Sequence, residues 1–140
     1  MIHENTLEEL AVARRVYRFY RCIDEANYDG LCEMVAPDGI WHRQGLALRG
    51  PAMVKEALLK RAPGVVAAHV LSNLTIDFPS AEEANVWCYA TTFRSDSQTV
   101  RPMPLPMEHP YSVTIQQQTY AMREGQWMLM LSRGTVLFQR

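Results

Sequence analysis

An aspartate and a histidine stand in sequence settings that suit acid–base chemistry. Asp24 ends the aromatic segment Tyr17–Asp24, and His69 lies near the start of the apolar segment Val65–Asn73. An imidazole titrates near neutral pH, and a carboxylate beside it can fix its tautomer and stabilise its charged form. We therefore expect a general-base pair in which His69 removes a proton and Asp24 orients it.

The first element that must position this pair is a helix over residues 6–27. Thr6 and Glu9 have the spacing of a capping box, which satisfies free amides at a helix start. Asp24 lies one turn beyond Tyr20 on a face defined by residues spaced three or four apart. That face comprises Leu10, Ala13, Tyr17, Tyr20 and Asp24. The spacing predicts that this face is buried.

The rest of the chain changes from helical to strand periodicity after Gly64. The first of these elements is a short helix over residues 31–36, which Asp29 would cap. It is followed by a short strand over 40–43, a loop over 45–50 and a third helix over 52–61. Four long strands follow, over residues 65–78, 84–94, 111–123 and 126–138, with a proline-rich loop at 95–110. This order predicts an α+β fold in one domain, residues 1–140. A curved antiparallel sheet would wrap around the N-terminal helices and form a cone with a central pocket.

Alternation along the strand over residues 65–78 predicts its two faces. His69, Leu71 and Asn73 share the face that would line the pocket. The other face is apolar and carries Val70, Leu74, Ile76 and Phe78. Since no helix remains to cover it, we expect a homodimer through the convex face of the sheet. In the alternative arrangement the helices cover this apolar face and His69 points to solvent.

Composition argues against several classes of partner. The formal net charge is −1 and no basic stripe is present, so nucleic-acid binding is not expected. No apolar run approaches the ~18 residues of a membrane span. Cys22, Cys32 and Cys88 are odd in number and lack metal-ligand spacing. They indicate reduced thiols in a cytoplasmic protein.

Several segments resemble those of SnoaL-like proteins in the nuclear transport factor 2-like superfamily. The resemblance is carried by Phe19–Leu31, Val35–His42, Leu48–Gly50, Ala68–Asn73 and the turn Glu124–Trp127. Scytalone dehydratase and hexachlorocyclohexane dehydrochlorinase, two enzymes of this type, pair a helix-1 aspartate with a histidine that begins a long strand. Those positions resemble Asp24 and His69. Around the pair, Ile23, Tyr89 and Gln116 depart from the dehydratase pattern, and the oxyanion pair of ketosteroid isomerase has no equivalent.

The resemblance and the residues together predict a cofactor-independent lyase or isomerase. Its substrate would be a small, mostly apolar molecule, aromatic or polyketide-like. The expected ligand-contacting residues are Tyr17, Tyr20, Trp41, His42, Leu71, Asn73, Tyr89 and Gln116. No metal is expected, although Asp24, His42 and His69 are conceivable ligands. Two other functions stay open: a binding protein without turnover, and an assembly subunit resembling the β subunits of ring dioxygenases.

Overall fold

The computed structural model describes residues 5–140 and contains three helices and six strands in that range. The helices are α1 (Thr6–Asp24), α2 (Tyr28–Cys32) and α3 (Gly50–Leu58). The strands are β1 (Val35–Arg43), β2 (Leu46–Arg49), β3 (Val66–Ser80), β4 (Glu83–Ser95), β5 (Ser112–Arg123) and β6 (Gln126–Gln139). The α+β class is confirmed, with the long strands close to their predicted bounds.

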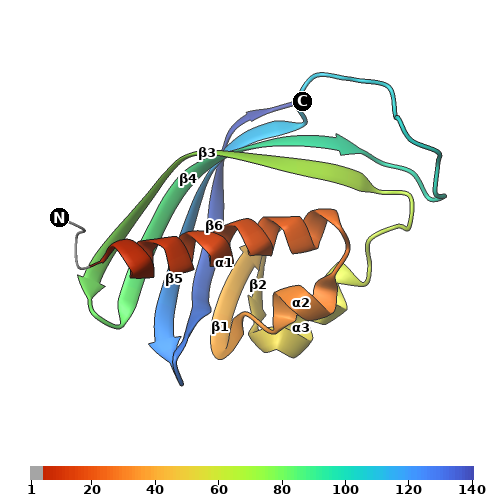
Figure 1. Ribbon diagram of the computed structural model, residues 1–140. Helices are drawn as coiled ribbons and strands as arrows, with labels where there is room; N and C mark the ends of the chain where they lie inside the picture. Colours follow the sequence, from red (N-terminus) through yellow and green to blue (C-terminus); the bar gives the residue numbers. More distant parts are fainter. Residues whose placement is uncertain (1–4) are drawn as a thin grey trace.

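The strands form one curved sheet in the order β2-β1-β6-β5-β4-β3. The four long strands pair antiparallel, as predicted. The sheet is nevertheless mixed, because β1 pairs parallel with β6. Figure 1 shows α1 lying across the concave side of the sheet, with α2 and α3 beside β1 and β2. The sheet and the helices together make the predicted cone.

The buried stripe of helix α1 overlaps the predicted one only in part, because Tyr20 is buried but Leu10 and Tyr17 are exposed. Its inward residues include Val12, Val16, Phe19 and Ile23, a continuous apolar row with spacings of four, three and four. Tyr17 is 53% exposed, because it lies outside this row. The capping box is also wrong: Thr6 is inside the helix, Asn5 is the N-cap, and no side chain caps this end.

Shorter elements near the start of the chain also differ from the predictions. Helix α2 begins earlier, where the Asn27 side chain accepts a 3.1 Å hydrogen bond from the amide of Gly30. The expected loop over 45–50 contains β2, which forms a hairpin with β1. Gln44 and Gly45 both have positive φ, which gives the tight turn that such a hairpin requires. Pro51 lies in the first turn of α3, as predicted.

A bulge at Asn73 changes which residues of β3 face inward. Asn73 has φ of 56°, and the pairing of β3 with β4 shifts between Ser72 and Thr75. The extra residue reverses the alternation, so both halves of β3 present apolar side chains to the concave side. Leu71, Leu74, Ile76 and Phe78 all pack against the core. The predicted division of β3 into a pocket face and an apolar outer face is therefore wrong beyond the bulge.

Part of the core fills one end of the cone, which we call the closed end. It is formed by Val12, Val16, Ala84, Val86, Tyr120, Trp127 and Leu129, each at most 3% exposed. Polar groups here are paired: Tyr120 donates to Gln118 at 2.7 Å, and Gln118 donates to Ser132 at 3.1 Å. No helix within residues 5–140 has the length and apolar character needed to cross a membrane.

Candidate active site

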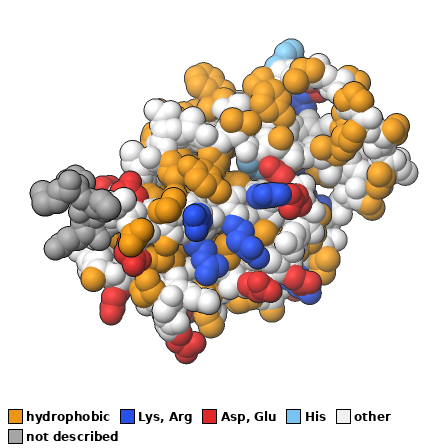
Figure 2. All heavy atoms as spheres, in the orientation of Figure 1, with side chains coloured by type: hydrophobic (Ala, Val, Ile, Leu, Met, Phe, Trp, Pro, Cys, Tyr) orange, Lys and Arg blue, Asp and Glu red, His pale blue; other side chains and the backbone are white. Residues whose placement is uncertain are grey.

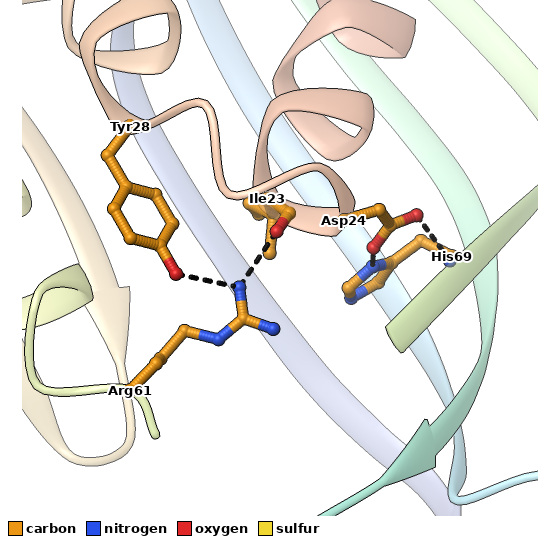
Figure 3. Close-up of polar contacts among 5 residues, drawn as sticks. All are labelled: Ile23, Asp24, Tyr28, Arg61 and His69. Carbon is orange, nitrogen blue, oxygen red and sulfur yellow. Dashed lines mark hydrogen bonds and ion pairs between the residues drawn. The ribbon is translucent and has the colours of Figure 1, made fainter. Parts of the chain in front are cut away.

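Asp24 and His69 lie together at the other end of the cone, which we call the open end. The last residue of α1 brings its carboxylate to the start of β3, where Oδ1 lies 2.6 Å from His69 Nδ1. The other oxygen, Oδ2, accepts a 2.9 Å hydrogen bond from the backbone amide of His69 (Figure 3). Two contacts to one residue fix both the position and the rotation of the carboxylate.

This contact determines which imidazole nitrogen can act as a base. An ionised carboxylate only accepts hydrogen bonds, so the Nδ1 of a neutral His69 carries the proton. Nε2 is then unprotonated, and the carboxylate would stabilise the imidazolium formed when it takes a proton. The side chains of Asp24 and His69 are 22% and 17% exposed, so the pair is shielded but reachable.

Arg21 lies three residues before Asp24 on α1, at a spacing that suits a salt bridge between side chains of one helix. Arg21 instead binds Glu25 at 2.8 Å, on the exposed side of the helix. Asp24 also does not join His42 in a three-ligand group, because His42 is exposed and projects from β1 on the face opposite Trp41. Across the part of the chain that the structure describes, no cluster of three His, Cys, Asp or Glu side chains suits a metal ion.

His69 lines an inner cavity of about 180 Å³. Trp41 and Tyr111 provide aromatic wall, and Gln116 provides an amide. The remaining lining residues are Ile23, Arg43, Gln44, Arg61, Ala67, Thr92, Arg94, Ser112 and Thr114. The Gln116 amide nitrogen donates to the Thr114 hydroxyl at 2.8 Å, which holds the Gln116 side chain in place. This wall combines aromatic, amide, hydroxyl and guanidinium groups, and is more polar than expected.

An outer cavity of about 450 Å³ adjoins the inner one. The two share Arg43, Gln44, Arg61 and Arg94 as lining residues. Arg43 stands over the ring of Trp41, with its guanidinium carbon 5.4 Å from the ring centroid. Burial, and then the nearby charges of Arg61 and Arg94, lower the pKa of the Arg43 guanidinium. Because Arg43, Arg61 and Arg94 all line it, the passage between the cavities is positively charged.

Arg61 connects this charged passage to the Asp24–His69 pair. Its Nη1 donates to the backbone carbonyl of Ile23 at 2.8 Å and lies 3.4 Å from the Tyr28 hydroxyl. Ile23 immediately precedes Asp24, so the guanidinium braces the helix end that carries the carboxylate. Figure 3 shows Arg61 reaching this helix end from one side while His69 meets it from the other.

Two further predicted residues lie near His69 but do not line the inner cavity. The Tyr20 ring is tilted against the imidazole, with 5.4 Å between centroids. Its hydroxyl is buried, and has no hydrogen-bond partner within residues 5–140. Burial raises the pKa of this hydroxyl well above its usual value, with smaller contributions from Cys88 and Tyr120. Leu71 packs against the core. Tyr20 therefore packs against His69, and Leu71 belongs to the core.

Four predicted ligand contacts lie elsewhere. Tyr17 is on the exposed side of α1, and His42 points away from the cavity. Asn73 forms the bulge and is exposed, so its role is in the backbone. Tyr89 alternates with the buried Cys88 and Ala90, which directs it to the convex face against Trp87. Alternation alone could have excluded Tyr89, since Cys88 and Ala90 are the more core-like pair.

The arginines of the passage were missed by the sequence reasoning. Arg43 could have been found, because it lies two residues after Trp41 on one strand and so shares its face. Arg94 is paired with Ala67, two residues before His69, but finding it requires the register of β3 against β4. Arg61 lies in an irregular segment after α3, where no periodicity indicates the direction of a side chain.

Residues 4–132 match the profile of the SnoaL-like domain. The chain belongs to this family. The search of curated proteins found no match. The residues that carried the resemblance in the sequence therefore identified the family correctly.

Solved structures share this fold at low identity. A candidate scytalone dehydratase from Novosphingobium aromaticivorans is 19% identical, with TM-score 0.72 over 97% of this chain and 88% of that one. The hexachlorocyclohexane dehydrochlorinase LinA-type3 from Novosphingobium barchaimii is 16% identical, with TM-score 0.71 over 96% and 92%. A Catenulispora acidiphila protein in complex with S-DNPA is 16% identical, with TM-score 0.71 over 93% of both chains. At these identities the likeness establishes the fold alone.

Proposed function

We propose that this SnoaL-like protein is a cofactor-independent lyase or isomerase in which His69 is the general base. The observation that carries the proposal is the two-point contact of Asp24 with His69, combined with the place of His69 in the inner cavity wall. Dehydratase and dehydrochlorinase proteins of the same fold support the reaction class.

The reaction would begin at a carbon next to a carbonyl or leaving group. His69 Nε2 takes the proton, the C–H bond breaks, and its electron pair stays on the substrate as an enolate or expels the leaving group. Asp24 stabilises the imidazolium that results. In an isomerase the proton then returns to another carbon. Trp41 and Tyr111 would hold an aromatic or polyketide-like body, and Gln116 would contact a substrate oxygen.

Deuterium exchange tests this function without a known substrate. A panel of small aromatic and aliphatic ketones is incubated in D2O, and loss of the C–H signal next to the carbonyl is followed by proton NMR. We expect exchange with the wild type, and a rate roughly 10²- to 10⁴-fold lower with Asp24→Asn or His69→Gln.

Two matched variants separate a specific effect from a general one. Asp77→Asn changes an exposed aspartate on β3, and His109→Gln changes an exposed histidine outside the site. Both should exchange at the wild-type rate. If Asp24→Asn and His69→Gln also did so, the pair would not be the base. Ligands that raise the melting temperature without any exchange would favour the binding-protein function.

Several further expectations remain part of this proposal. We expect residues 1–140 to act as one domain, in the cytoplasm, without a cofactor and without nucleic acid. A homodimer through the convex face no longer has the support of Leu74, Ile76 and Phe78, which pack against the core. The half-buried Trp87 and Tyr89 now support it, together with the 53%-exposed Val70. Sedimentation velocity measures the oligomeric state directly.

A further inference from the structure

The charged side chains that line the outer cavity are mostly cationic. Arg43, Lys60, Arg61 and Arg94 line it, and Asp96 is the one acidic residue among them. The whole chain has a net charge of −1, so this excess of positive charge is local. Three of the four cations also line the inner cavity beside His69. We call Arg43, Arg61 and Arg94 the cavity arginines.

The cavity arginines are poorly compensated by the protein itself. Arg94 binds Asp96 at 2.8 Å. Arg43 makes no ion pair or side-chain hydrogen bond within residues 5–140. The Nε of Arg61 is buried and has no partner in the same range. Arg43 therefore has donors left for a ligand, and the Arg61 Nε is a buried donor of the kind that normally has an acceptor.

The arginines of α1 provide a contrast within the same molecule. Figure 2 shows basic side chains gathered over the outer side of this helix, where Arg14, Arg18 and Arg21 are exposed. Arg18 lies 3.9 Å from Glu33, and Arg21 binds Glu25. Water solvates these groups and acidic neighbours partly neutralise them. Arg43 is less exposed to water than these arginines and has no acidic partner within residues 5–140, which favours an anionic ligand.

We propose that the cavity arginines bind the carboxylate of a small organic acid, which is the substrate class of the His69 site. The identification as substrate rests on the proposed function, whereas binding of the carboxylate does not. A guanidinium presents paired N–H donors in the planar geometry that a carboxylate accepts, and such charge-assisted bonds are strong. The two cavities leave room for a small organic body rather than a macromolecule.

The arrangement also explains how the acid would be oriented. With its carboxylate at the passage, its aromatic or apolar body would enter the inner cavity and lie against Trp41 and Tyr111. The carbon that loses a proton would then face His69. Because Arg61 braces the carbonyl of Ile23, the anion site and the base are held by adjacent residues. Such fixed positioning is what proton abstraction from carbon requires.

Binding of matched acid and amide probes tests the proposal. Titration calorimetry compares benzoate with benzamide, and cinnamate with cinnamamide, at low ionic strength, where charge contributes most. We expect at least one acid to bind the wild type about tenfold or more tightly than its amide. Arg43→Gln should remove this preference, and Arg43→Lys should retain part of it. Arg133→Gln removes an exposed charge of β6 and should leave the preference intact.

The opposite results would overturn the proposal. These are acids binding no better than amides, no binding by either acid, or equal loss of preference in Arg133→Gln and Arg43→Gln. Thermal unfolding of each variant shows that it is folded, and Arg94→Gln gives a second variant if Arg43→Gln is not. His69→Gln distinguishes this proposal from the proposed function. If His69→Gln keeps the preference for acids and the wild type shows no deuterium exchange with the ketones, only the anion site is supported. If the wild type shows deuterium exchange but no preference for acids, only the base is supported.

Discussion

The two ends of the cone differ in what fills them. At the closed end, Val12, Tyr120 and Leu129 are at most 1% exposed and the polar groups pair with one another. At the open end, a cavity of about 180 Å³ lies beside His69, and Arg61 and Tyr20 each have a buried polar atom with no hydrogen-bond partner within residues 5–140. The same sheet and the same helix therefore support two environments of opposite character.

Along α1, the residues that stabilise the fold are separate from the residue that would take part in chemistry. The row Val12, Val16 and Phe19 packs against the sheet and supplies apolar burial. Five residues after Phe19, the helix ends in a carboxylate that binds a histidine next to a cavity. A buried polar group without a hydrogen bond costs stability, and a cavity wall buries less apolar surface than a packed core, so we expect the closed end to offset what the open end loses.

The largest expected effect comes from creating a cavity at the closed end. Leu129→Ala should lower the free energy of unfolding by about 2–5 kcal/mol, because a fully buried leucine leaves a void that its neighbours fill only partly. Leu46→Ala is the matched change at the open end, where Leu46 is 59% exposed and lines the outer cavity. It should cost less than about 0.5 kcal/mol.

Urea unfolding followed by tryptophan fluorescence measures both variants. A similar loss in Leu46→Ala and Leu129→Ala would contradict the division of the molecule into a stabilising end and a functional end. A loss confined to Leu129→Ala would support it.

Much of the fold and part of the site could be predicted from the sequence. The long strands follow from alternation and turn residues, and Glu124–Gly125 has the positive φ angles of a tight hairpin turn. Asp24 and His69 were recognised because their flanking segments are distinctive. The parallel pairing of β1 with β6 could not be predicted, because it joins strands far apart in the chain.

The bulge at Asn73 is the feature that most changes the faces predicted for β3. Strict alternation places Leu74, Ile76 and Phe78 opposite His69, and one extra residue brings them to the same side. Asparagine tolerates the left-handed region, but it also occurs in regular strand and turn positions. The sequence alone therefore does not reveal that this residue reverses the faces of β3 between the open and closed ends.

The second expected effect concerns this bulge. Asn73→Val should destabilise the protein by about 1–2 kcal/mol, because a β-branched residue is strained at φ of 56°. Asn73→Gly should be close to neutral, since glycine adopts this conformation freely. Ser72→Val is the matched control, because Ser72 is exposed in the same strand and valine suits a strand.

Urea unfolding again gives the measurement for these three variants. Equal losses in Ser72→Val and Asn73→Val would mean that the cost does not arise from the backbone at the bulge. A loss of stability in Asn73→Val alone would show that the backbone conformation of Asn73 is required for the bulge between the two halves of β3.

The last expected effect, which is absent near neutral pH, is a pH dependence from Cys88, which lies between the two ends on β4. Burial raises the pKa of its thiol to about 11, against about 8.5–9 in an unfolded chain. The folded state therefore holds the thiol proton more tightly than the unfolded state does. The stability that follows from this difference is fully present below pH of about 9 and is lost as pH rises through the folded pKa.

Comparison with Cys88→Ala isolates this contribution from those of the buried tyrosines, whose pKa values are also raised. Between about pH 9 and pH 11, the wild type should lose more stability than Cys88→Ala, as measured by urea midpoints at several pH values. Parallel pH profiles would mean that water reaches Cys88, and that the open cavity extends further along β4 than its lining residues indicate. A steeper wild-type profile would fix the boundary between the hollow and the packed ends of the cone at or before this residue.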